Sequence, residues 1–195
     1  MNESEVMREF RDSKAILDGH FILSSGLHSR QYMQCARLLV DADRARRISE
    51  ALANKIEKEF DGDVDIVVAP AMGGVVIGAL VALALGKPSI FCERENGEFR
   101  FRRGFDVPLG ARALVVEDVV TTGLSSHETF ACIVDAGGVP VAEACIANRM
   151  GEDRIENVPL FSLCRPKIDV FSPQHVPADL LSVPPVKPGS RTLKK

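Results

Sequence analysis

Two adjacent carboxylates followed by a turn rich in hydroxyl groups form the stretch of this chain with the clearest chemistry. Glu117 and Asp118 follow the apolar run 113–116, which is typical of a strand buried on both faces. The turn 121–125, Thr-Thr-Gly-Leu-Ser, leads into a helical pattern, and unpaired N–H groups at a helix N-terminus suit a phosphate. The carboxylates suit the vicinal hydroxyls of a ribose and a nearby Mg²⁺ ion.

A simpler interpretation explains part of this stretch. Ser125 and Glu128 have the spacing of a capping box, so the serine could serve only to begin the helix. Capping explains neither the acidic pair nor the threonines, and one serine can both cap a helix and bind a phosphate. We therefore interpret residues 117–125 as a site for a phosphorylated sugar.

The composition favours one globular domain and argues against several other classes of protein. A chain of 195 residues with 46% hydrophobic and 26% charged residues can bury one sizeable core. A net charge of −3 argues against nonspecific binding of nucleic acid. No stretch is long and apolar enough to span a membrane, and residues 1–10 are too charged for a signal peptide. We therefore expect a cytoplasmic protein that has no membrane partner.

The five cysteines are spread widely along the chain and include no C-x-x-C pair. Most of them lie in apolar runs, where cysteine behaves as a small buried hydrophobic residue. We expect structural cysteines rather than a zinc site or a disulfide framework.

The hydrophobic patterns predict strands that alternate with helices. Strands are expected at 64–69, 88–93, 113–116, 140–147 and, at an edge, 158–164. Helices are expected at 4–17, 43–60, 75–85 and 126–136. This alternation implies right-handed crossovers and an α/β fold with a parallel sheet of about five strands flanked by helices. Ligands of such sheets bind outside the carboxyl ends of the strands, where the acidic pair is expected.

Two further segments follow predicted strands and could contact an anion. Gly73 and Gly74 would let the backbone approach a ligand closely, although their order does not meet the dinucleotide fingerprint G-x-G-x-x-G. Asn96-Gly97 predicts a type I′ hairpin that would form a flap. The flap carries four arginines, Arg94, Arg100, Arg102 and Arg103. They could close over an anionic group or form a solvated charged face.

The acidic pair, the two aliphatic residues after it and T-T-G-x-S resemble the binding motif for phosphoribosyl diphosphate (PRPP) of the type I phosphoribosyltransferases. The resemblance implies that a continuous segment binds PRPP, namely Glu117, Asp118, Val119, Val120, Thr121, Thr122, Gly123, Leu124 and Ser125. The acidic pair would hold the ribose hydroxyls, and the turn would hold the 5-phosphate. Gly73 and Gly74 would leave room for pyrophosphate. Three flap arginines would close over it, namely Arg94, Arg102 and Arg103.

Two other motifs resemble those of the orotate phosphoribosyltransferases within this family. The segment 19–29, G-H-F-x-L-S-S-G-x-H-S, predicts a β-hairpin by itself and closely matches the hood that closes over the base. The segment 148–151, Asn-Arg-Met-Gly, is similar to an Asp-Arg-x-Gly motif whose arginine meets the carboxylate of the base. A guanidinium can bind a carboxylate with two hydrogen bonds, although a surface arginine on a turn is the simpler interpretation. The orotate-binding residues that the resemblance implies are Thr121, Arg149, Phe21, Ser25 and Gly26.

The resemblance covers roughly residues 14 to 190, because V-K-P-G-S-R near the end is also similar to bacterial members of the family. It implies a single type I phosphoribosyltransferase domain, 1–195. Within this domain we expect a small hood mainly at 1–40, a flap at about 93–104 and an irregular tail at 166–195. The chain departs from the family pattern at Ser24, where many relatives have a lysine, and at Asn148.

The implied activity is the transfer of the 5-phosphoribosyl group from PRPP to orotate in pyrimidine biosynthesis, with Asp118, Glu117 and Arg94 as catalytic residues. Mg²⁺ is expected to bind mainly through PRPP, and the resemblance implies a homodimer. A purine phosphoribosyltransferase and a noncatalytic regulator that senses PRPP are the alternatives. The hood and Arg149 favour a carboxylated pyrimidine, and a regulator would usually need a nucleic-acid-binding element that no pattern here indicates.

Overall fold

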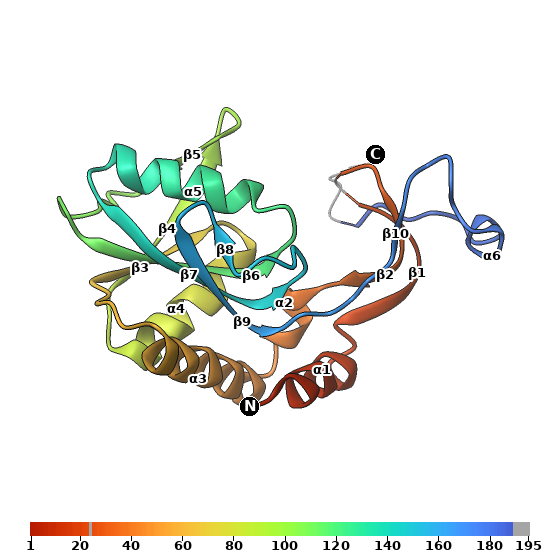
Figure 1. Ribbon diagram of the computed structural model, residues 1–195, viewed down its shortest axis with the longest axis horizontal. Coiled ribbons are helices and arrows are strands. Elements are labelled where there is room, and N and C mark those ends of the chain that lie inside the picture. The colour runs from red at the N-terminus through yellow and green to blue at the C-terminus, as the bar shows by residue number, and fades with distance from the viewer. Residues whose placement is uncertain (24, 189–195) are drawn as a thin grey trace.

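A large sheet with helices on both faces and a smaller sheet beside it make up the protein, a computed structural model that describes residues 1–23 and 25–188 (Figure 1). The large sheet contains β3 (Ile66–Pro70), β4 (Ser89–Glu95), β5 (Glu98–Phe101), β6 (Arg112–Val120), β7 (Val139–Asn148), β8 (Arg154–Ile155) and β9 (Val158–Cys164). The small sheet contains β1 (Ile16–Ile22), β2 (His28–Met33) and β10 (Val170–Phe171). The helices are α1 (Glu3–Asp12), α2 (Cys35–Leu38), α3 (Ala42–Glu59), α4 (Gly73–Leu85), α5 (Leu124–Asp135) and α6 (Ala178–Leu181).

The large sheet has the strand order β5-β4-β3-β6-β7-β9-β8. The five strands from β4 to β9 are parallel, which confirms the parallel sheet expected from the sequence. β5 and β8 add an antiparallel strand at each edge, so β9 is not the outermost strand as expected. The flap hairpin is confirmed, because Asn96 and Gly97 between β4 and β5 both have positive φ, as a type I′ turn requires.

The helices cover the sheet on both faces, with α3 and α4 on one side and α5 on the other (Figure 1). Side chains alternate along β6: Leu114 and Val116 belong to the core with α3 and α4, whereas Ala113 and Val115 belong to the core with α5. A strand that is buried on both faces needs apolar residues at successive positions, and this explains the unbroken apolar run at 113–116.

Two predicted boundaries are wrong because pairing between distant segments overrides the local pattern. The helix expected at 4–17 ends at Asp12, since Lys14 takes a left-handed conformation and Ile16 begins β1, which pairs with β2. β6 does not end before the acidic pair but continues through it to Val120, because its pairing with β7 extends as far as Asn148.

The starts of two helices also differ from expectation. α4 begins at Gly73 rather than at Val75, so both glycines lie in its first turn. α5 begins at Leu124 with Gly123 as its N-cap and has no side-chain cap. The capping-box interpretation of Ser125 and Glu128 is therefore wrong, and the Glu128 carboxylate instead pairs with an arginine of the flap.

The hood is the small sheet formed by β1, β2 and β10, together with the chain that follows β10 (Figure 1). The tail is thus not wholly irregular, because β10 pairs with β2 and α6 forms a short helix. Val186 accepts a hydrogen bond from the Ile22 N–H and donates one to the His20 carbonyl, both at 2.8 Å. Ser24 and residues 189–195, which include the end of V-K-P-G-S-R, lie outside the described residues.

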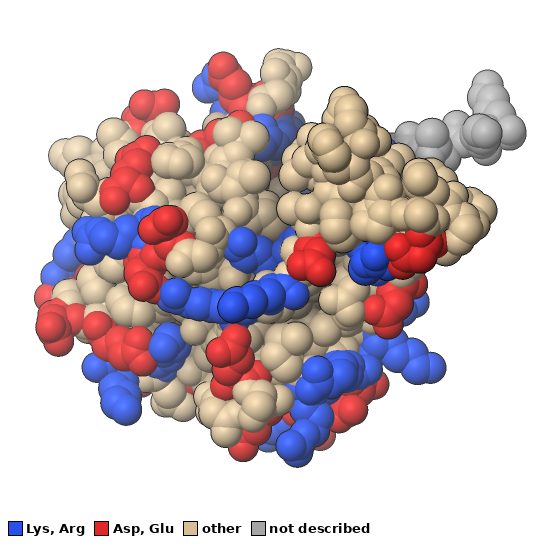
Figure 2. Space-filling model, turned by 45° about the vertical axis from the view of Figure 1, so that its right-hand side comes forward, with Lys and Arg blue, Asp and Glu red and all other residues tan. Residues whose placement is uncertain are grey.

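Acidic and basic side chains lie next to one another over the left and lower parts of the face shown in Figure 2. All five cysteines are buried free thiols, as their apolar surroundings in the sequence predicted. Within residues 1–23 and 25–188, none of the helices has the length and apolar character needed to span a membrane.

Candidate active site

A cavity of about 1110 Å³ lies where the carboxyl ends of β6 and β7 face the hood. Seven of the residues singled out from the sequence line it: Ser25, Asp118, Val119, Thr121, Thr122, Leu124 and Arg149. They come from the hood, from the end of β6 and the turn after it, and from the segment after β7. The topology explains this convergence, because β6 and β7 are adjacent parallel strands whose carboxyl ends share one edge.

The acidic pair lies at this edge in an environment that disfavours two charges. The Asp118 N–H donates to Glu117 Oε2 at 3.1 Å, and the Val119 N–H donates to Asp118 Oδ1 at 2.8 Å. Burial raises the pKa of Asp118, and burial together with the Asp118 charge raises the pKa of Glu117 well above its usual value. Across the described chain neither carboxylate forms an ion pair with a cation. A ligand that brings hydroxyl donors or a cation would therefore stabilise the ionised pair.

Gly73 and Gly74 at the start of α4 lie against the acidic pair. A Cβ atom on Gly73 would lie 2.6 Å from Asp118 Oδ1. A Cβ atom on Gly74 would lie 2.6 Å from the carbonyl oxygen of Val116 and 3.2 Å from Glu117 Oε2. Neither position has room for a side chain, so glycine is what allows the first turn of α4 to approach the carboxylates.

The turn after β6 presents two exposed threonines and the start of α5. Gly123 has a φ of 75°, a left-handed conformation that turns the chain into the helix. The Leu124 N–H donates to Thr122 Oγ1 at 3.4 Å. The other first-turn N–H groups have no partner within the helix, and together with the threonine hydroxyls they form a turn suited to a phosphate group.

Arg149 supplies a cation on the cavity wall. The backbone N–H of Arg149 donates to the Val120 carbonyl at 2.8 Å, which fixes the backbone of Arg149 beside β6. Its guanidinium is half-buried and forms no ion pair in the described chain, and burial lowers the pKa of Arg149. A cation in this environment gains most from an anionic ligand.

Asn148, the departure from the family pattern, shapes the turn that carries Arg149. Its Oδ1 accepts hydrogen bonds from the N–H groups of Met150 at 2.9 Å and Gly151 at 3.2 Å. Its Nδ2 donates to the Glu152 carbonyl at 2.7 Å. The donor half of the amide is used here, so the asparagine forms one hydrogen bond that an ionised aspartate could not form.

Two of the expected hood residues do not line the cavity. Phe21 is buried and packs against Tyr32 with the ring centroids 5.8 Å apart, and Gly26 lies at the tip of the hairpin. Tyr32 itself lines the cavity, and burial followed by the Asp118 charge raises its pKa. The motif comparison did not point to Tyr32, which is the single tyrosine of the chain and lies on β2.

Each flap arginine is paired with a carboxylate, and none lines the cavity. Arg94 pairs with Glu128 of α5, donates to the Gly97 carbonyl at 2.6 Å and lies 4.4 Å from the centre of the Phe99 ring. The other flap pairs are Arg100 with Glu98 at 2.6 Å, Arg102 with Glu95 at 3.2 Å and Arg103 with Glu93 at 3.1 Å. The flap in this structure is therefore close to charge balance.

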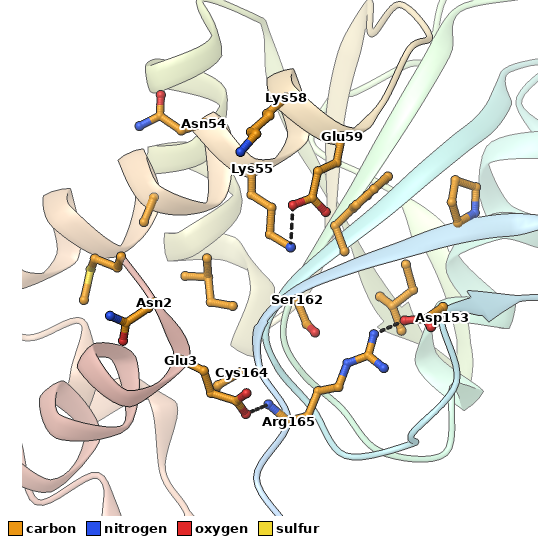
Figure 3. A pocket seen from close by; sticks show the side chains of 16 residues that line it. Asn2, Glu3, Asn54, Lys55, Lys58, Glu59, Asp153, Ser162, Cys164 and Arg165 are labelled. Carbon is orange, nitrogen blue, oxygen red and sulfur yellow. Dashed lines mark hydrogen bonds and ion pairs between the residues drawn. The ribbon is translucent and has the colours of Figure 1, made fainter.

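Another cavity, of about 720 Å³, lies between α1, α3 and β9 (Figure 3). Its charges are mostly matched internally: Lys55 pairs with Glu59, Arg165 pairs with Asp153, and Glu3 accepts the Arg165 N–H at 2.6 Å. None of the site residues singled out from the sequence lines this cavity. Those predicted site residues that line either cavity therefore all line the larger one.

Comparisons with known proteins agree with the motifs. No protein-family model matches the chain. The chain is 48% identical over 191 residues to the orotate phosphoribosyltransferase of Erythrobacter litoralis, covering 98% of this chain and 99% of that protein. It is 46% identical to the orotate phosphoribosyltransferase of Methylorubrum extorquens, covering 100% of both chains.

Solved structures show the same fold. The orotate phosphoribosyltransferase of Aeropyrum pernix gives a TM-score of 0.68 at 26% identity, covering 82% of this chain and 93% of that chain. An adenine phosphoribosyltransferase from Thermoanaerobacter pseudethanolicus gives a TM-score of 0.58 at 18% identity, covering 69% of this chain and 88% of that chain. This second likeness concerns the fold alone.

The close approach of Gly73 to the Asp118 carboxylate leads to a testable prediction. Gly73→Ala places a methyl carbon 2.6 Å from Asp118 Oδ1, so the carboxylate has to move. We expect the dissociation constant for PRPP, the ligand that the motif implies, to rise about tenfold or more in titration calorimetry.

Gly78→Ala is the matched control in the same helix, because its Cβ would meet the Ala69 side chain at 2.8 Å, among core residues rather than carboxylates. This control should lower the melting temperature while the PRPP affinity stays as in the wild type. Unchanged PRPP affinity in Gly73→Ala would contradict the role assigned to this contact.

Proposed function

The chain belongs to the orotate phosphoribosyltransferase family, and from this premise we propose how its residues bring PRPP and orotate together. The reaction transfers the 5-phosphoribosyl group from PRPP to orotate, giving orotidine 5′-monophosphate and pyrophosphate, in pyrimidine biosynthesis. The proposed location is the cytoplasm, a reducing compartment in which the five free thiols would persist.

One observation carries the proposed substrate arrangement: the unpaired guanidinium of Arg149 lines the same cavity as Thr121 and Asp118. Orotate carries a carboxylate, and a guanidinium can bind a carboxylate through two charge-assisted hydrogen bonds. Arg149 would hold this carboxylate, and Thr121 would face the base. Ser25 and Tyr32 of the hood would close the cavity around the ring.

PRPP would bind along the end of β6 and the turn after it. Glu117 and Asp118 would accept hydrogen bonds from the ribose hydroxyls, and such bonds stabilise the ionised form of carboxylates whose pKa burial has raised. The turn 121–125 would hold the 5-phosphate at the N-terminus of α5. Pyrophosphate would bind beside Gly73 and Gly74, whose backbone at the start of α4 lies against the acidic pair.

Mg²⁺ is part of this proposal. The Asp118 carboxylate lines the cavity and offers the hard oxygen donors that Mg²⁺ prefers. The described residues contain no group of three side chains able to hold a metal by themselves, so the oxygens of PRPP would supply most of the ligands. When bound, the ion would neutralise negative charge on the pyrophosphate group.

The chain would contribute mainly positioning and electrostatic stabilisation to the transfer. The ring nitrogen of orotate loses its proton as its bond to the ribose forms, and that proton would pass to the departing pyrophosphate or to water. Pyrophosphate leaves with charge that donors and cations must balance. The acidic pair lies where positive character would develop on the ribose, and the hood would exclude water. Asp118, Glu117 and Arg94 are therefore the proposed catalytic residues.

The reaction and the role of Arg149 can be tested together by following the ultraviolet absorbance of orotate with PRPP and Mg²⁺. We expect a PRPP-dependent decrease, with orotidine 5′-monophosphate as product. Arg149→Ala should raise the KM for orotate roughly ten- to hundredfold and change the KM for PRPP little, because only the base loses a charged partner.

Arg154→Ala is the matched control for Arg149, because Arg154 is exposed and donates to the Asn157 carbonyl outside the cavity. It should behave as the wild type. If Arg149→Ala raised both KM values equally, Arg149 would not belong to the base site.

The flap arginines would exchange their carboxylate partners for pyrophosphate when the flap closes. Arg94→Ala, Arg102→Ala and Arg103→Ala should be compared by kcat/KM for PRPP, and we expect a loss of about tenfold or more in at least one variant. Arg100→Ala is the control, since Arg100 pairs with Glu98 on its own strand and was not singled out as a PRPP contact. If the three test variants all had the kinetics of the wild type, the flap arginines would form only a solvated face.

The proposal includes a homodimer, which the outer face of α4 supports. Met72, Val76 and Leu83 are 83%, 50% and 77% exposed at helical spacing, although α4 is apolar on all sides. A helix that is apolar on all sides is normally buried on all sides. A second subunit would cover the exposed apolar face of α4.

Leu83→Asp should therefore give a monomer in sedimentation equilibrium at concentrations where the wild type is a dimer, because it places a charge in the apolar face. Val134→Asp is the control, since Val134 is similarly exposed on α5, on the opposite side of the sheet. A dimer that withstands Leu83→Asp would exclude the α4 face as the interface.

A further inference from the structure

Glu143 is a buried carboxylic acid that the proposed transfer does not use. It lies on β7 with no exposed surface, between the small apolar residues Ala142 and Ala144. Its Oε1 accepts a hydrogen bond from Ser126 Oγ at 2.8 Å. Its Oε2 is the one buried side-chain oxygen or nitrogen in the described chain that has no hydrogen-bond partner. A buried polar atom without a partner is costly and calls for an explanation.

The position of Glu143 connects two elements of the PRPP site. Ser126 lies in the first turn of α5, directly after Ser125 of the phosphate-binding turn. On the sheet, β7 pairs with β6, and the Glu143 charge contributes to the raised pKa of Glu117. Glu143 therefore lies beneath the phosphate-binding turn and acts electrostatically on a carboxylate proposed to hold the ribose.

The surroundings of Glu143 offer its charge no compensation. The titratable groups on which it acts are Glu117 on β6 and Cys145 on its own strand, and both would be acidic neighbours. Its direct neighbours across the sheet are Val115 on β6 and Leu160 on β9. No ion pair to Glu143 occurs in the described chain, and α5 offers only the Ser126 hydroxyl.

Burial raises the pKa of Glu143 to about 7, with the Ser126 hydrogen bond as a smaller opposing effect. The side chain is therefore neutral in mildly acidic solution and ionised in mildly basic solution. The ionised form adds a buried negative charge beneath a turn that must bind a phosphate, and like charges repel strongly where water is excluded.

We propose that Glu143 is a positioning residue for PRPP: as a neutral acid it accepts the Ser126 hydroxyl at the first turn of α5 without adding charge, whereas its ionised form opposes the bound anion. This inference rests on the proposed PRPP site. PRPP affinity is then linked to one proton on Glu143. The affinity is highest while Glu143 is protonated and falls as the pH rises through the pKa of the free protein.

The experiment compares the wild type with Glu143→Gln by PRPP titration calorimetry at about pH 6 and about pH 8.5, on either side of the Glu143 pKa. Gln keeps the size and an oxygen that can accept the Ser126 hydrogen bond, but it cannot ionise. Titration of the PRPP phosphates affects both proteins equally, so the ratio of the wild-type to the variant dissociation constant isolates Glu143. We expect this ratio to rise roughly three- to tenfold from the lower to the higher pH.

The orotate affinity provides an internal comparison, because Glu143 is not among the residues that line the cavity with Arg149. The corresponding ratio for orotate should stay constant with pH. A PRPP ratio that does not change with pH would overturn the proposal. Failure of the PRPP site itself would look different, since neither protein would bind PRPP at the lower pH.

A second measurement keeps the proposal testable if Glu143→Gln does not fold. The carboxyl carbon of Glu143 in the wild-type protein, labelled with carbon-13, can be titrated by NMR with and without PRPP. Linkage requires PRPP to raise the pKa of Glu143, because the ligand favours the protonated form. An identical titration in both states would overturn the proposal.

Discussion

The repulsion between two neighbouring half-buried carboxylates is the constraint to which the rest of this site responds. Glu117 and Asp118 follow one another on β6, and in the described chain no cation pairs with either. Backbone N–H groups of Asp118 and Val119 satisfy part of their hydrogen-bonding capacity, and two glycines bring the start of α4 against them. The protein supplies no cation for these carboxylates. A ligand that brings hydroxyl donors or a cation would therefore stabilise their ionised forms.

The positive charge of the flap is matched by carboxylates in this structure. Four arginines face three glutamates within the flap and Glu128 on α5, so the flap is nearly neutral when it is not engaged. Exposed ion pairs of this kind contribute only about 0–1 kcal/mol each, since water competes for both partners. A pyrophosphate group with several negative charges can displace such partners, whereas the pairing prevents the arginines from repelling one another in its absence.

The sequence was informative where a local pattern decides the structure. Apolar runs of strand length identified the inner strands, and Asn96-Gly97 identified the hairpin because few other turns accept positive φ at both positions. The positions of Asp118 and Arg149 in one cavity also followed from the sequence, since each residue comes at or just after the end of one of two adjacent parallel strands.

Long-range contacts account for what the sequence did not reveal. β6 runs through the acidic pair because β7 supplies hydrogen bonds regardless of side-chain polarity, and Ile16 joins a strand because β2 is there to pair with it. Glu128 has the spacing of a capping residue, yet its carboxylate forms an ion pair with Arg94 of the flap hairpin. Tyr32 and the tail residues of the cavity wall carry no local signal that would place them beside β6.

The hood illustrates why such contacts matter for the site. A hairpin of two strands is marginally stable by itself, and β1 and β2 gain a third strand only from β10, far along the chain. The Val186 N–H donates to the His20 carbonyl, the Val186 carbonyl accepts from the Ile22 N–H, and His20 Nδ1 lies 2.8 Å from the Val183 carbonyl oxygen. Residues 165–170 of the same tail line the cavity beside Arg149. This wall of the cavity is therefore built from both ends of the chain, and its stability depends on the tail as much as on β1 and β2.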